Sequence, residues 1–112
     1  MSLDISLKLF VDVGTTEPYE VLLYSDNYTH NVCPMWELAG VWEALYESDG
    51  QQAAELISTL EKGYEAMRAS PAAYCALNPS NRWGDYSGAL KFLQAFTDAC
   101  KKFPKALVWV SR

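Results

Sequence analysis

The sequence predicts an α+β fold in a single domain, residues 1–112, with an N-terminal β-hairpin, three helices and a C-terminal strand. Residues 3–13 alternate apolar and polar side chains, three later segments carry apolar residues at helical spacing, and residues 106–110 form an apolar run. Each helix has one apolar stripe, so one face of a sheet of about three strands can bury all three helices. The pattern leaves open whether the last strand pairs with the first strand or with the second.

The hairpin is predicted by a period of two that ends in turn residues. Every odd position from Leu3 to Val13 is apolar, which is typical of a strand with one buried face. Residues 14–18, Gly-Thr-Thr-Glu-Pro, carry breakers at both ends, and residues 19–24 are rich in strand formers. We therefore expect two strands joined by a short connection.

The first helix is expected between Pro34 and about Tyr46. Proline suits the first position of a helix, because the backbone N–H that it lacks would have no partner there. Trp36 and Trp42 fall on helical spacing and are assigned to the core. The stripe that faces the sheet is Leu38, Val41, Trp42 and Leu45.

Two further helices are marked by their ends. The form Ser48-x-x-Gln51 predicts a capping box for the second helix, which Pro71 ends, and a short helical turn covers residues 71–77. Asp85 is the expected cap of the third helix, which Pro104 prevents from continuing. The predicted stripes are Ala53, Leu56, Ile57, Leu60, Tyr64 and Met67 for the second helix, and Ala89, Leu90, Leu93, Phe96 and Cys100 for the third.

Composition excludes several classes of partner. Fourteen acidic and nine basic residues give a net charge of -5, which disfavours binding to nucleic acid. Lys101, Lys102 and Lys105 form the one local group of bases, and they complement the dipole at a helix end. No stretch approaches the length of a membrane span or resembles a signal peptide, so no membrane partner is expected. Three cysteines without a CxxC pattern fit free thiols, and we expect a cytoplasmic location.

The sheet face without helices is predicted to be an interface. If the odd positions of the first strand face the helices, Phe10 points away from them. Burying the β-branched residues of the last strand then leaves Leu107 and Trp109 outside, and Leu22 and Tyr24 extend this face. An apolar patch of this kind usually marks a contact surface, so we expect a homodimer through Phe10, Leu107 and Trp109. The alternative is a loop or the N-terminal segment folded over the same face.

Two turn-rich loops, residues 26–36 and 78–86, carry the candidate site. Loops on a rigid scaffold often hold functional side chains, and amides beside aromatic rings suit a neutral or weakly polar ligand such as a base or a sugar. The asparagines are equally suited to building turns. The predicted ligand-binding residues are Tyr28, His30, Asn31, Asn81, Arg82, Trp83 and Asp85.

Catalysis is an open alternative. His30 and Cys33 stand three apart, which suits a thiol activated by an imidazole, and Asp85 is a second candidate partner for His30. A small buried cysteine and a structural histidine explain the same residues more simply. No metal site is expected, because too few ligands lie close together, and no cofactor is expected, because the glycines match no phosphate-binding pattern. Glu43 and Glu47 are interpreted as part of a solvated helix face.

Several segments resemble a known group of proteins. They are Thr-His-Asn at 29–31, Pro-Met-Trp at 34–36, and Asn-Pro-Ser-Asn-Arg-Trp-Gly-Asp-Tyr at 78–86. They look like segments of small uncharacterised proteins from bacterial and phage genomes, and the resemblance covers most of the chain. It implies no activity, but it implies that the two loops belong together.

The sequence therefore predicts a small cytoplasmic binding module, a homodimer, that holds a small molecule or a protein partner with loops 26–36 and 78–86. One alternative is a small enzyme that uses His30 with Cys33 or Asp85. Another is a structural or host-interaction protein that acts through its sheet face.

Overall fold

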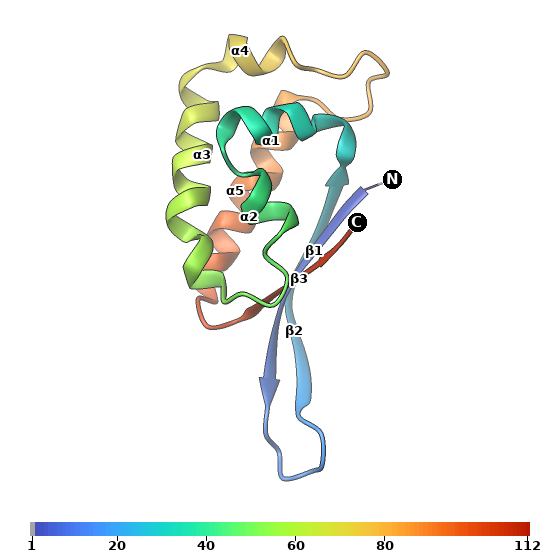
Figure 1. Ribbon diagram of the computed structural model, residues 1–112, viewed down its shortest axis with the longest axis vertical. Coiled ribbons are helices and arrows are strands. Elements are labelled where there is room, and N and C mark those ends of the chain that lie inside the picture. The colour runs from blue at the N-terminus through green and yellow to red at the C-terminus, as the bar shows by residue number, and fades with distance from the viewer. Residues whose placement is uncertain (1) are drawn as a thin grey trace.

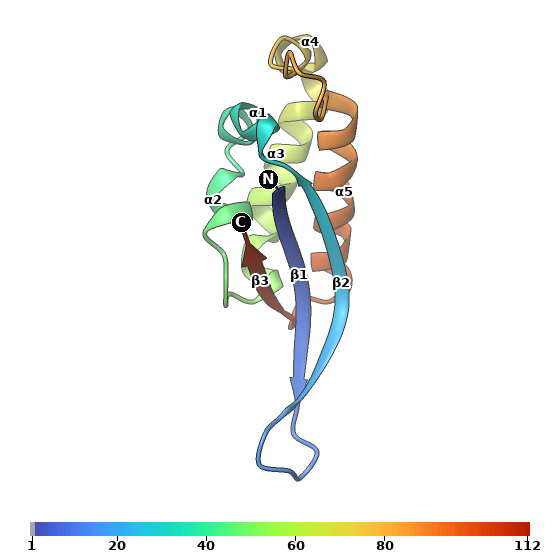
Figure 2. The ribbon, with the colours of Figure 1, turned by 90° about the vertical axis from the view of Figure 1, so that its right-hand side faces the viewer.

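The computed structural model describes residues 2–112 and has the predicted α+β architecture (Figure 1). Three antiparallel strands, β1 (Ser2–Val11), β2 (Tyr19–Thr29) and β3 (Leu107–Ser111), form one sheet in the order β2-β1-β3. The helices cover one face of this sheet, as the side view in Figure 2 shows. The last strand therefore pairs with the first, which resolves the strand order.

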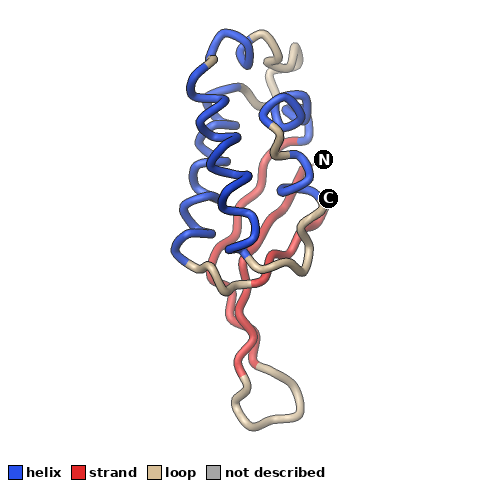
Figure 3. The backbone as a smooth tube through the Cα atoms, turned by 60° about the vertical axis from the view of Figure 1, so that its left-hand side comes forward, coloured by secondary structure: helices blue, strands red, loops and turns tan. Residues whose placement is uncertain are grey.

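The helical layer is built mainly from α3 and α5, which run beside each other on the sheet (Figure 3). The Asp85 side chain accepts a hydrogen bond from the Gly88 N–H at 2.7 Å, so it caps α5 as predicted, and α5 ends two residues before Pro104. The helical elements are η1 (His30–Val32), α1 (Cys33–Ala39), α2 (Trp42–Tyr46), η2 (Ala53–Leu56), α3 (Ile57–Ala69), α4 (Pro71–Cys75) and α5 (Tyr86–Lys102).

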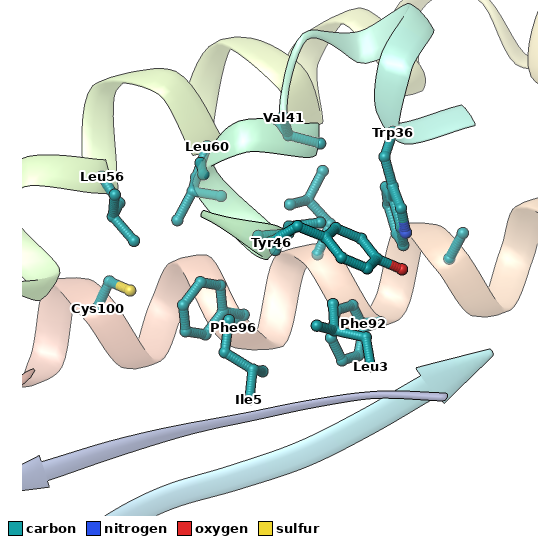
Figure 4. Packing of buried hydrophobic residues seen from close by; sticks show 14 of the residues in the cluster. Leu3, Ile5, Trp36, Val41, Tyr46, Leu56, Leu60, Phe92, Phe96 and Cys100 are labelled. Carbon is teal, nitrogen blue, oxygen red and sulfur yellow. The ribbon is translucent and has the colours of Figure 1, made fainter. Parts of the chain in front are cut away.

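The core lies between the inner half of β1 and the helices (Figure 4). Leu3 and Ile5 face Phe92 and Phe96 of α5 there, while Leu60 lies on the opposite side of the cluster. Burying side chains of this size contributes about 1.5–3 kcal/mol each, so this cluster supplies most of the driving force for folding. The largest fully buried side chains are Trp36, Phe96, Leu3, Ile5, Leu7, Met35, Leu45, Leu60, Met67, Leu93, Val32 and Val41.

The prediction of one continuous helix between Pro34 and Tyr46 is wrong, because the chain leaves the helical conformation at Gly40. Gly40 has φ 75°, a left-handed conformation that ends a helix and that glycine adopts without strain. Its N–H and that of Val41 return to the carbonyls of α1. The break turns the chain by enough to leave Leu38, which the stripe assigned to the core, 57% exposed.

The capping box predicted at Ser48 and Gln51 is also wrong. The box forms four residues later, where Gln52 and Glu55 exchange hydrogen bonds at the start of η2. Residues 48–52 instead run along β3: the Gly50 N–H donates to the Val108 carbonyl at 2.7 Å, and the Val108 N–H donates to the Gln51 carbonyl at 2.8 Å. This pairing buries Ser48 completely and covers the outer edge of β3.

The apolar residues at the odd positions of β1 continue beyond the part of the strand that the helices bury. Leu3, Ile5 and Leu7 are buried as predicted, but Leu9 and Val11 are exposed, and Val13 lies beyond the end of the strand. The cause is that the hairpin projects past the helices as a free two-stranded extension, clearly visible in all three ribbon and tube views (Figures 1–3). We call residues 9–22 the arm.

The open face of the sheet is close to the prediction, with one correction. Phe10 lies 6.3 Å from Trp109 on this face, measured between ring centroids, and Lys8 Nζ lies 4.1 Å from the centroid of the indole. A bulge between Leu7 and Lys8 adds a residue to β2 and reverses the direction of its side chains. Tyr24 consequently faces the helices and packs against Phe96, so it does not extend the open face.

At Gly63, α3 approaches the connection between α1 and α2 closely. A β-carbon at Gly63 would overlap the Val41 side chain and lie 3.2 Å from the Ala39 carbonyl. Gly63→Ala gains about 1 kcal/mol of helix propensity. The overlap forces the α1–α2 connection outward, however, and overpacking of this kind costs about 1–3 kcal/mol. The two contributions together predict a net loss of about 1 kcal/mol, and of about 2 kcal/mol at most, in the free energy of unfolding measured with urea. Ala66→Ser on the exposed side of the same helix is the control and should stay within about 0.5 kcal/mol; equal effects of the two changes would contradict the close approach.

Candidate functional site

The two loops singled out by the sequence lie against each other. The Tyr28 hydroxyl, at the end of β2, accepts a hydrogen bond from the Asp85 N–H at 3.1 Å and lies 3.3 Å from the Asp85 carbonyl oxygen. The Tyr28 ring also stacks on Phe92 at 5.8 Å between centroids. Tyr28 therefore joins residues 57 positions apart and anchors the second loop to the sheet.

Two glycines make this contact possible. Gly84 has φ 93°, and a β-carbon there would lie 2.5 Å from the Thr29 methyl group. A β-carbon on Gly88 would overlap the Tyr28 hydroxyl. Both positions exclude larger residues, because the backbone of one loop touches side chains of the other.

A shallow hollow of about 380 Å³ lies where the loops meet. Trp83 stands beside it with 66% of its surface exposed, which is unusual for so large an apolar side chain. The lining combines an amide, hydroxyl groups and two aromatic rings, as expected for a weakly polar ligand. The lining residues are Ser2, Asn27, Tyr28, Thr29, Trp83 and Gly84.

Several predicted contact residues hold the loop together. The Asn81 side chain accepts a hydrogen bond from the Trp83 N–H at 3.0 Å, and the Asp85 carboxylate is used to cap α5. Arg82 has φ 63° and an exposed side chain. Asn78, outside the predicted set, accepts a hydrogen bond from the Tyr86 N–H at 2.8 Å. These side chains fix the conformation in which Trp83 is presented.

His30 belongs to a different cluster, centred on the Tyr46 hydroxyl. His30 Nδ1 lies 2.8 Å from that oxygen, and Cys33 Sγ donates to it at 3.2 Å. Burial first, and then the hydrogen bond from Cys33, raise the pKa of Tyr46 above its ordinary value. The Tyr46 hydroxyl thus joins His30 and Cys33 in one hydrogen-bonded cluster.

Sequence reasoning missed two members of this cluster. Tyr46 was interpreted as the end of a helix, yet it is 5% exposed and connects His30 with Cys33. The Arg112 guanidinium lies 5.8 Å from the Tyr46 ring centroid and forms an ion pair with Glu47 at 3.6 Å. Nothing in the local sequence indicated Arg112, because its partners lie more than sixty positions earlier.

A groove of about 820 Å³ lies between α1–α2 and the start of α3. Glu43 and Glu47 line it together with Glu37 and Glu55, so these glutamates share a concave surface, whereas the sequence suggested a simple solvated helix face. Among the described residues, no group of three histidine, cysteine or acidic side chains is placed to hold a metal ion. The groove is acidic, but its carboxylates form no coordination site.

The comparisons give no assignment. No protein-family model, no curated protein and no solved structure matches the chain. The resemblance to bacterial and phage proteins therefore stays a prediction. Within residues 2–112, no helix is both long and apolar enough to span a membrane.

Thiol reactivity tests whether Cys33 is activated. Cys75 is exposed, Cys33 is half-buried and donates to Tyr46, and burial raises the pKa of Cys100 to about 12. Since the thiolate is the reactive form, iodoacetamide at neutral pH should label Cys75 first, Cys33 several-fold more slowly and native Cys100 not at all. Peptide mass mapping reports each site, and protein in urea is the control in which all three react. Faster labelling of Cys33 than of Cys75 would contradict a Cys33 thiol held in its hydrogen bond to Tyr46 and would favour an enzyme.

Proposed function

We propose that the protein is a small binding module that holds a planar, weakly polar ligand or partner group at the joined loops. The observation that carries this proposal is the exposed Trp83 indole beside the hollow. Stacking on an exposed aromatic ring contributes about 1–3 kcal/mol when a base is bound. The Asn27 side chain lines the same hollow and offers a donor and an acceptor for the ligand edge.

The bracing of the loop supports this proposal further. Binding is weakened when a loop must become ordered, and each immobilised side chain costs about 0.5–1.5 kcal/mol. Here the loop is already held by Asn81, by Tyr28 and by the close packing of Gly84 against Thr29. An exposed tryptophan on a rigid loop is therefore preorganised for contact.

The enzyme alternative has less support. His30 and Cys33 both direct their polar atoms to Tyr46, and the Asp85 carboxylate is engaged at the N-terminus of α5. Cys33 Sγ and His30 Nδ1 are directed to Tyr46 and away from a substrate, which leaves Nε2 as the one nitrogen of His30 that could serve as a general base. The same contacts support a structural role for His30.

We further propose self-association, as a homodimer, through the open sheet face. Phe10 and Trp109 are 38% and 44% exposed and pack against each other, with Leu107 half-buried beside them on the same face. Lys8 covers one side of the indole. Polar residues such as Ser6 surround this cluster, and an apolar centre with a polar rim is typical of a protein interface.

A cytoplasmic location is part of the same proposal. Cys33, Cys75 and Cys100 are all unpaired, and Cys75 is exposed. Exposed free thiols are typical of a reducing compartment.

Ligand titration tests the loop site. We expect a nucleoside or a neutral sugar from a screened panel to shift the Trp83 indole resonance and the Asn27 amide resonances in nitrogen-15 NMR spectra. Trp83→Ala should weaken that binding about tenfold or more, because it removes the stacking surface, while changing the free energy of unfolding by about 1 kcal/mol or less. Tyr19→Ala, which removes an aromatic ring 63% exposed on the arm, is the matched control. Equal losses from both variants, or no shift near Trp83 at millimolar ligand, would refute the proposed site.

The molar mass of the protein in solution tests self-association. Light scattering at micromolar concentration should give twice the chain mass, and Trp109→Thr should weaken the dimer about tenfold or more, as expected for a central interface residue. Leu38→Gln replaces another exposed apolar side chain, 57% exposed on α1 and away from the open face, and should leave the mass unchanged. A wild-type mass of one chain would rule out the homodimer.

A further inference from the structure

The arm, residues 9–22, is the part of the hairpin that nothing covers. β3 pairs with β1 only between Asp4 and Lys8, so from Leu9 onward β1 has a neighbouring strand on one side alone. The helices end above this point (Figures 1 and 2). A two-stranded hairpin that stands alone in water is marginally stable at best.

The arm is also where exposed apolar surface gathers. Nine large hydrophobic side chains are exposed on the described part of the chain, and six of them belong to the arm. They occupy both faces of the hairpin, because the odd positions of β1 continue the helix-facing side and Phe10 and Leu22 continue the open side. The six are Leu9, Phe10, Val11, Val13, Tyr19 and Leu22. Scattered exposed side chains are ordinary, whereas such a cluster marks an interaction surface.

The free edge of β1 lacks the usual protection. Natural sheets block exposed edges with lysine, proline or a covering segment. The edge beyond Lys8 reads Leu9, Phe10, Val11, with neither lysine nor proline, while the outer edge of β3 is covered by residues 50–52. An unpaired apolar edge is suited to accept another strand through backbone hydrogen bonds.

Charge indicates which strand the edge accepts. The arm carries three acidic residues, Asp12, Glu17 and Glu20, and no basic residue. Glu20 forms an ion pair with Lys8 at 3.3 Å, so Asp12 and Glu17 are the acidic residues toward the tip. Lys102 and Lys105 lie at the lower end of α5 and in the connection to β3, beside the base of the arm (Figure 1), whereas the neighbouring Lys101 is ion-paired with Glu61 at 2.7 Å. If two arms run antiparallel, the acidic tip of each arm reaches the lysines beside the base of the other copy's arm. Two parallel arms would bring the acidic tips together, which is unfavourable.

We propose that the arms of two copies of this chain pair antiparallel, edge to edge along β1, around a two-fold axis near Phe10. This inference rests on the proposed self-association and places the contact at the free edge of β1, beside the open sheet face, so that the open faces of the two copies become continuous. Opposed residues in antiparallel strands point to the same face, so both Phe10 rings join the Trp109 cluster on the open side. Leu9 and Val11 of the two copies meet on the other side.

The arrangement is self-complementary, which favours a second copy over an unrelated partner. In a two-fold dimer each contact occurs twice, so the apolar edge and the match of acidic tip to basic base are both satisfied by one chain type. An unrelated strand would satisfy the edge but would need its own basic group for the tip.

Cross-linking between differently substituted chains tests the geometry. In a background of Cys33→Ser and Cys75→Ser, one chain carries Thr15→Cys at the tip of the arm and the other carries Lys105→Cys at its base. Cys100 is buried and remains. A short bismaleimide added to the mixed dimer should join Thr15→Cys to Lys105→Cys between chains, and isotope labelling of one chain identifies the product. The control mixes Thr15→Cys with Ser58→Cys, an exposed position on α3, and should give no product above background.

The outcomes separate the two proposals. A dimer that cross-links tip to base supports the paired arms. A dimer that does not cross-link, or that joins tip to tip, overturns the paired arms while self-association stands. A measured mass of one chain overturns both proposals, and the arm would then be a surface for an unrelated protein partner.

Discussion

The architecture depends on a difference in length between the hairpin and the helices that cover it. At about 3.3 Å per residue, the 11 residues of β2 extend about 36 Å. The 17 residues of α5 rise only about 25 Å. The helices therefore seal the inner half of β1, where Ile5 and Leu7 are fully buried, and leave the outer half in water. This gives a molecule 53 Å long with a radius of gyration of 14.9 Å, against about 13 Å for a compact domain of this length.

The two ends of the hairpin consequently have different surroundings. At the inner end, Tyr28 is held by Asp85 and stacks on Phe92, which fixes the loop that presents Trp83. At the outer end, the arm meets the rest of the fold at its base, where Phe10 packs against Trp109, and it projects into solvent beyond that contact. The hollow and the arm lie at opposite ends of the same two strands, so occupation of one surface leaves the other accessible. A ligand site and a self-association surface can thus coexist in 112 residues.

Local signals predicted most of the elements, and long-range contacts explain the failures. Alternation, proline and the Asp85 cap located the hairpin and α5 correctly, because each depends on neighbouring residues. The Gly40 break had a local signal, a glycine within the helical spacing, but the apolar stripe that continues past it outweighed that signal, whereas the bulge after Leu7 has no clear local signature. Alternation shows that one strand face is apolar but not how far another layer covers it, so the exposure of the arm was not predictable. The contact between the two loops was predicted, whereas the position of Tyr46 at the centre of the His30 cluster was not.

The segment that pairs with β3 has a consequence for aggregation. Residues 106–110 form a short, apolar, uncharged stretch rich in strand formers, which is the composition of fibril-forming peptides. Backbone hydrogen bonds from Gly50 and Gln51, and the Asp49 carboxylate that accepts from the Val110 N–H at 2.8 Å, occupy its outer edge. Local opening of residues 48–52 would bare that edge while the rest of the domain stays folded. A five-residue connection that contributes no apolar side chain to the core thus separates this stretch from other strands that could pair with it.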